Sequence, residues 1–253
     1  MDIVAVAVLG FFALGYLLLG GSDIGTGMIM PLLARDPGER RLVITTIAPF
    51  FLANEVWLVA TVGVLAGAFP LLENSLLHTH FVPFVVLLVA WVVRDMGLWL
   101  RGRVDAPRWR ASCDAAIVAG SWAVALSWGV VFTGVPAGGT GVAGVVGVLA
   151  VAALFGTHGL AFASIRLSGE LRDRARRLSG PVGEVPLLAL TSAGLVVLGV
   201  LVGAGLAPAA LVADHATLAF LLPPLLIAAP ALVAAQAWVW WTFRHRVVKP
   251  AYL

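Results

Sequence analysis

Residues 3–34 read IVAVAVLGFFALGYLLLGGSDIGTGMIMPLLA, an apolar run whose one charged side chain is Asp23. A helix needs about 20 apolar residues to cross roughly 30 Å of hydrocarbon, so this run is long enough to span a membrane. The rest of the chain is similar, since 61% of its 253 residues are hydrophobic and only 11% are charged. These charges are too few to cover the surface of a soluble domain of this size. The sequence therefore predicts an integral membrane protein.

Apolar runs of similar length recur along the whole chain. They predict an all-α, polytopic membrane helix bundle that forms a single integral membrane domain over residues 1–253. The seven transmembrane helices are expected at about residues 3–34, 44–68, 81–100, 114–133, 142–165, 185–206 and 217–243.

The basic residues alternate with these spans. Lys and Arg follow the first, third, fifth and seventh spans, and none lies in the loops after the second, fourth and sixth. The residues are Arg35, Arg40, Arg41, Arg101, Arg103, Arg108, Arg110, Arg166, Arg172, Arg174, Arg176, Arg177, Arg244, Arg246 and Lys249. Because basic loops stay on the cytoplasmic side, we expect the N-terminus outside and the C-terminus in the cytoplasm of a prokaryotic cell. Orientation also explains the net charge of +3, so no nucleic-acid partner is predicted.

A few strongly polar side chains interrupt the apolar spans. They are Asp23, Asn54, Glu55, Arg94 and His158. Charge within hydrocarbon is costly, so such residues usually line a buried interior or a working pathway. At about 1.5 Å per residue, Asp23 and Glu55 both lie about 18–21 Å from the basic loop between their spans, and Arg94 and His158 lie about 10–12 Å from theirs.

Three interpretations of this set stay open: a proton relay, a cation site, and a network that only fixes the bundle. For Asp23 and Glu55 we favour function, because of the cost of placing carboxylates at mid-membrane. For Arg94 we favour a structural role, since Asp95 is adjacent and a long side chain can reach the membrane surface. For His158 we favour a hydrogen-bonded packing histidine.

Haem ligands are scarce in the predicted spans. Membrane haems need His or Met ligands at matching depth on facing helices, and His158 is the one histidine within a span. One haem held by His158 together with Met28, Met30 or Met96 stays open. We therefore predict no catalytic residue and no metal site in this chain alone, and we assign no cofactor to it.

Several motifs follow one another in a fixed order. They are Gly21-Ser22-Asp23-Ile24-Gly25-Thr26-Gly27-Met28, Gly38-Glu39-Arg40-Arg41, Asn54-Glu55-Val56-Trp57 and His158-Gly159. Together they resemble subunit II of the cytochrome bd-type quinol oxidases, well over roughly residues 20–170 and loosely in the last span. The resemblance implies a membrane complex of the respiratory chain that oxidises quinol and reduces oxygen to water.

The resemblance also implies a partner. In that family the b-type and d-type haems and the quinol site belong to subunit I. Subunit II is a haem-poor partner that stabilises subunit I in a heterodimer and contributes to a proton path. Here Asp23, Asn54, Glu55, Arg94 and His158 are the candidates for that path or for a polar network. A bound quinone is left open, as is a bound lipid besides the surrounding membrane lipids.

Two departures from the family pattern matter. Family members commonly have acidic residues where this chain has Gly20 and Leu52, so the proton path is expected to be altered or lost. They also usually have about two more spans in the C-terminal half. Two alternatives therefore remain: a transporter that binds a proton or cation at Asp23 and Glu55, and a non-catalytic scaffold derived from the oxidase subunit.

Overall fold

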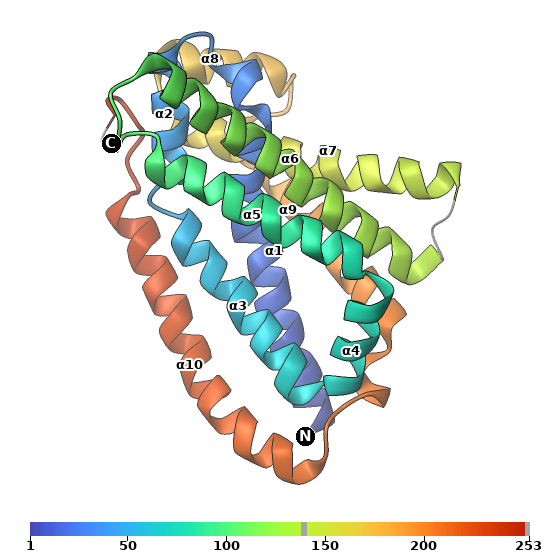
Figure 1. Cartoon of the computed structure of the whole chain (residues 1–253). Helices are drawn as coiled ribbons and strands as arrows, with labels where there is room; N and C mark the ends of the chain where they lie inside the picture. The colour runs from blue at the N-terminus through green and yellow to red at the C-terminus, as the bar shows by residue number, and fades with distance from the viewer. Residues whose placement is uncertain (138–140, 251–253) are drawn as a thin grey trace.

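The computed structural model describes residues 1–137 and 141–250, and most of these residues lie in α-helices (Figure 1). The longer helices are α1 (Asp2–Leu33), α3 (Phe51–Ala68), α5 (Phe81–Leu100), α6 (Pro107–Ala137), α7 (Val142–Arg166), α9 (Glu184–Leu206) and α10 (His215–Thr242). The shorter ones are α2 (Pro37–Ile47), α4 (Pro70–Thr79), α8 (Gly169–Leu178) and the 3₁₀ turn η1 (Pro208–Ala210). Within the described residues, seven helices are long and apolar enough to cross a membrane. The predicted all-α class and the number of spans are confirmed.

The chain ends lie at opposite ends of the bundle (Figure 1). Helices α2 and α8 lie at the end that carries the C-terminus, and α4 lies nearer the end that carries the N-terminus. This arrangement suits an odd number of spans. Which end faces the cytoplasm stays a prediction from the basic loops.

Helix α1 is the centre of the bundle. It contacts α3, α6, α7 and α9, and each residue from Gly20 to Met30 is buried. A helix that is buried on all faces cannot be amphipathic, which explains why this run has no polar stripe. The small residues of the run let neighbouring helices approach it closely.

The closest approach joins α1 to α7. A Cβ added to Gly25 would lie 1.8 Å from the Phe155 backbone oxygen, and one added to Gly159 would lie 2.1 Å from backbone atoms of Gly25 and Thr26. The Thr26 hydroxyl also donates to the Gly159 carbonyl oxygen over 3.0 Å. Glycine is therefore required on both helices, because backbone meets backbone there.

The predicted second span is divided by a turn. Residues 44–68 were expected to form one helix, but α2 ends at Ile47 and α3 begins at Phe51. Pro49 explains the break, because proline has no N–H to donate to the helix ladder and its ring clashes with the carbonyl of the preceding turn. The membrane-spanning part of this segment is thus α3 alone.

Charged contacts hold the short helices α2 and α8 together at the end of the bundle that carries the C-terminus. The Arg174 guanidinium on α8 donates to Glu39 Oε2 over 2.8 Å and to Oε1 over 3.2 Å. It also donates to the carbonyl of Leu33, the last residue of α1. One arginine therefore ties α8 to α2 and satisfies a free carbonyl at the end of α1.

Replacing Gly25 by alanine should destabilise the bundle. The new Cβ would overlap the α7 backbone, and forcing extra atoms into a packed core costs about 1–3 kcal/mol. We expect a lower melting temperature for detergent-solubilised Gly25→Ala. Gly10→Ala is the control on the same helix, because nothing lies within 4 Å of its added Cβ. Equal melting temperatures for the two variants would contradict the close α1–α7 contact.

Stability in acid should depend on Glu39. The hydrogen bonds from Arg174 lower the pKa of Glu39 below its usual value. A lowered pKa in the folded state stabilises the fold above the unfolded pKa, and this stabilisation is lost as the pH falls through the folded pKa. Glu39→Gln should therefore lose less stability than the wild type between neutral pH and about pH 3. Melting temperatures at several pH values test this, with Glu73→Gln as control. Parallel curves for wild type and Glu39→Gln would show that the pair is not formed.

Candidate functional site

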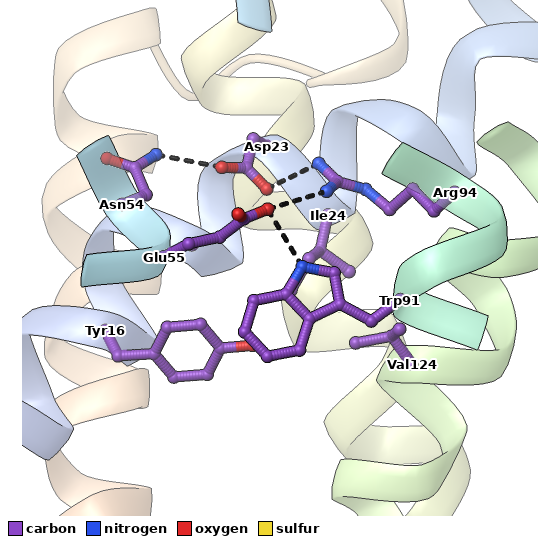
Figure 2. A pocket seen from close by; sticks show the side chains of 9 residues that line it. Tyr16, Asp23, Ile24, Asn54, Glu55, Trp91, Arg94 and Val124 are labelled. Atoms are coloured by element: carbon purple, nitrogen blue, oxygen red, sulfur yellow. Dashed lines mark hydrogen bonds and ion pairs between the residues drawn. The ribbon is translucent and has the colours of Figure 1, made fainter. Parts of the chain in front are cut away.

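Four of the predicted polar residues meet between α1, α3 and α5 (Figure 2). Asp23 comes from α1, Asn54 and Glu55 from α3, and Arg94 from α5. The Asp23 and Arg94 side chains are only 4% and 2% exposed, so the group is enclosed by the bundle. We call Asp23, Asn54, Glu55, Arg94 and the adjacent Asp95 the polar cluster.

Arg94 is the hub of the polar cluster. Its Nη2 donates to Asp23 Oδ1 over 2.7 Å, and its Nη1 donates to Asp95 Oδ1 over 2.7 Å. The same Nη1 lies 4.0 Å from Glu55 Oε1. Arg94 does pair with Asp95 as expected, but its side chain points into the bundle and not to the membrane surface. A long side chain thus reaches the deeper carboxylate, which depth along the sequence did not suggest.

Asp23 is held on both oxygens. Asn54 Nδ2 donates to Asp23 Oδ2 over 2.9 Å, while Arg94 occupies Oδ1. The same Asn54 nitrogen also donates to the Leu19 carbonyl over 3.0 Å. A carboxylate that accepts from a guanidinium and an amide is held in one orientation. Asp23 is therefore the fixed anionic partner of Arg94.

Glu55 and Asp95 lie at the edge of the cluster. Their side chains are 19% and 18% exposed. Trp91 Nε1 donates to Glu55 Oε1 over 2.8 Å, as Figure 2 shows. Both carboxyl groups face the one Arg94 nitrogen, so they lie close together. These two groups are the accessible members of the cluster.

A small cavity adjoins the cluster. It is lined by Tyr16, Gly20, Asp23, Ile24, Asn54, Glu55, Trp91, Arg94 and Val124. It leaves about 10 Å³ for the centre of a water molecule, which is close to the smallest space that holds one water. The buried Nε of Arg94 has no hydrogen-bond partner in the protein, so it is a suitable donor to such a water.

Gly20 and Leu52, where the resemblance leads one to expect acidic residues, lie in different surroundings. A Cβ at Gly20 would lie 2.7 Å from the Tyr16 ring, so a larger side chain does not fit while the ring stays in place. Leu52 is 49% exposed and lies on α3 one turn before Glu55. The cluster in this chain is thus built without either position.

His158 lies apart from the polar cluster on α7. Its Nδ1 is 2.8 Å from the Thr191 hydroxyl, and its Nε2 is 2.9 Å from the Leu18 carbonyl oxygen. Because a carbonyl only accepts, Nε2 must donate to it. His158 therefore connects α7 to α1 and α9.

Sequence reasoning missed Gln236 on α10. Its Nε2 donates to Asn54 Oδ1 over 2.9 Å, and its Oε1 accepts from Trp57 Nε1 over 3.2 Å. A buried amide within an apolar span was a usable signal, since it needs partners. The sequence could not name those partners, because α3 and α10 are far apart in the chain.

Removing the Arg94 charge should destabilise the protein strongly. Arg94→Met leaves Asp23 buried without a cation, and breaking a buried pair in this way costs about 3–5 kcal/mol. Adding Asp23→Asn should recover part of the loss, because the uncompensated charge is then gone. Melting temperatures of the single and double variants test this.

Arg110→Met is the matched control. Arg110 pairs with Asp105, and these side chains are 39% and 91% exposed. Exposed pairs contribute about 0–1 kcal/mol, so little change is expected. A double variant that is no more stable than Arg94→Met alone would contradict the ion pair.

Comparisons with known proteins agree with this architecture. The family model described as "Cytochrome bd terminal oxidase subunit II" matches residues 1–213. The chain is 34% identical over 203 residues to "Cytochrome bd ubiquinol oxidase subunit 2" of Bacillus subtilis (strain 168), a match that covers 74% of this chain and 59% of the relative. It is 30% identical over 201 residues to "Probable cytochrome oxidase subunit 2" of Haemophilus influenzae, which covers 72% of this chain and 53% of the relative.

A third relative is "Cytochrome bd-I ubiquinol oxidase subunit 2" of Escherichia coli (strain K12), 32% identical over 125 residues. That match covers 49% of this chain and 33% of the relative. Across the three, the chain spans from one third to about three fifths of the relatives' length. With seven helices among the described residues able to cross a membrane, the chain is a multi-pass protein of the cell membrane. It belongs to the cytochrome bd terminal oxidase subunit II family.

Proposed function

We propose that this chain is the haem-poor subunit of a quinol:oxygen oxidoreductase, in a heterodimer with a haem-bearing subunit I. We also propose that its polar cluster passes protons toward that partner. Family membership supports the complex. The observation that carries the proton role is the pairing of two partly exposed carboxyl groups, those of Glu55 and Asp95, on one buried arginine.

The charge count of the cluster favours proton exchange. One guanidinium faces three carboxyl groups, those of Asp23, Glu55 and Asp95. If all three were ionised, the cluster would carry excess negative charge in a low-dielectric setting, which is costly. Two neighbouring carboxyl groups that cannot both ionise share a proton. Arg94 donates to Asp23 and to Asp95 over 2.7 Å but lies 4.0 Å from Glu55, so Glu55 is the carboxyl group best placed to carry the proton.

The geometry gives this proton a place and a route. Trp91 occupies Glu55 Oε1, so Oε2 is the atom that would hold the proton. The adjoining cavity, with room for one water, extends the cluster toward Tyr16. Protons could then move between Glu55, Asp95 and a water without displacing the Asp23–Arg94 pair.

The position of these carboxyl groups also indicates where the partner docks. The apolar residues exposed on α3 and α5 include Val56, Val59, Val85, Val89, Val92 and Met96. Partly exposed carboxyl groups facing lipid are unfavourable. We therefore propose that subunit I covers the side of the molecule on which Glu55 and Asp95 are exposed.

Neutralising either accessible carboxyl group should slow the oxidase. In the complex with its subunit I, Glu55→Gln and Asp95→Asn should each lower quinol oxidation by about tenfold or more, because positioned proton-transfer groups contribute about 10²–10⁴-fold. Oxygen consumption measures turnover, and a reduced-minus-oxidised spectrum measures the haem content.

Glu73→Gln on α4 is the control, since it makes the same chemical change outside the cluster. Turnover that stays at the wild-type level in Glu55→Gln and Asp95→Asn would remove the proton role and favour a scaffold. A colourless preparation of the chain from its native membrane, without a larger partner, would overturn the oxidase proposal and favour a transporter.

A further inference from the structure

We infer that Gln236 is a positioning residue that, together with the Leu19 carbonyl, fixes the direction of the Asn54 amide and so supports the pairing of Asp23 with Arg94. Gln236 belongs to α10, which begins after residue 213, where the family match ends. The predicted effect on turnover rests on the proposed function. The effect on Asp23 does not.

The direction of the hydrogen bonds is set by Trp57. An indole nitrogen can only donate, so the atom of Gln236 that faces Trp57 must be its oxygen. The Gln236 nitrogen then faces Asn54 and requires an oxygen there. The Asn54 oxygen is thereby occupied, and its nitrogen is left to donate to Asp23. Trp57 thus fixes the direction of the Gln236 amide, and Gln236 acts together with the Leu19 carbonyl to turn the Asn54 nitrogen toward the carboxylate.

Without Gln236 this direction is held only from the other end of the Asn54 amide, where the nitrogen donates to Asp23 and to the Leu19 carbonyl. The Asn54 oxygen then has no donor facing it, so the amide is held less firmly. A loosened amide donates less well to the Asp23 carboxylate. Loss of Gln236 should therefore favour the protonated form of Asp23 and weaken its pairing with Arg94.

The position of Gln236 on α10 supports a specific role. Most of α10 is exposed, and its buried residues are Leu218, Leu222 and Gln236. The first two contribute packing, which apolar side chains do without a desolvation cost. Placing an amide within an apolar helix is favourable only if it is hydrogen-bonded, and both ends of Gln236 are. The rival explanation is that Gln236 only attaches α10 to α3.

The test measures the protonation of Asp23 directly. Infrared spectra of the purified full chain are recorded across pH, and Asp23→Asn identifies the Asp23 carboxyl signal. Gln236→Met should raise the midpoint pH of that signal, so that Asp23 is half protonated at about one tenth of the original proton concentration. The reason is that a hydrogen bond to a charged group is worth about 1.5–3 kcal/mol. Trp57→Phe should move it in the same direction. The double variant should show less than the sum of the two effects, because both act through one chain of bonds.

Leu222→Met is the matched control, because it alters a buried α10 residue without touching an amide. It should leave the Asp23 signal unchanged. An unchanged signal in Gln236→Met, or an equal change in Leu222→Met, would overturn the inference in favour of simple attachment of α10.

Turnover of the complex separates this inference from the proposed function. A shifted Asp23 signal with wild-type turnover in Gln236→Met, Glu55→Gln and Asp95→Asn would refute the proton role and leave the positioning role standing. Slowed turnover in Glu55→Gln and Asp95→Asn with an unchanged Asp23 signal in Gln236→Met would refute the positioning role alone.

Discussion

The ion pair between Asp23 and Arg94 is the interaction on which the site depends. It joins the central helix α1 to α5 over 2.7 Å in a setting where both side chains are almost fully buried. A charge in hydrocarbon is tolerated only with a partner, so the pair constrains how α1 and α5 lie. Asn54 and Glu55 add α3 to the same contact. The three helices therefore meet where their buried charged groups satisfy one another.

Close helix packing and the polar cluster are complementary. On one side of α1, Gly25 lets the α7 backbone at Phe155 and Gly159 approach directly, which leaves no room for side chains at that crossing point. On the other side, long side chains from α3 and α5 fill the space and carry the charges. The same helix thus packs rigidly against one neighbour and hosts a polar cluster with the others. Proton exchange within a membrane protein requires both properties, a fixed frame and groups that can exchange.

Much of the fold could be predicted because hydrocarbon imposes strong rules on composition. Long apolar runs determine the number of helices, and the few charged residues within them mark the site. Asp23, Asn54, Glu55 and Arg94 were identifiable on this basis. The division of residues 44–68 was not foreseen, although Pro49 was visible. A continuous apolar run conceals such a break. It is the placement of α2 beside α8 that shows that the first part of the run does not cross the membrane.

The sequence by itself determined that this is a helical membrane protein of the subunit II family, and which residues carry polarity in its interior. Tertiary structure alone decided which of them meet. Hydropathy does not encode helix rotation where a helix is buried on every face, as α1 is from Gly20 to Met30, so the pairing of Asp23 with Arg94 was not readable. The place of Gln236 depends on a contact across 182 positions of the chain. His158, which the sequence grouped with the others, lies elsewhere because α7 presents it to α9 and α1.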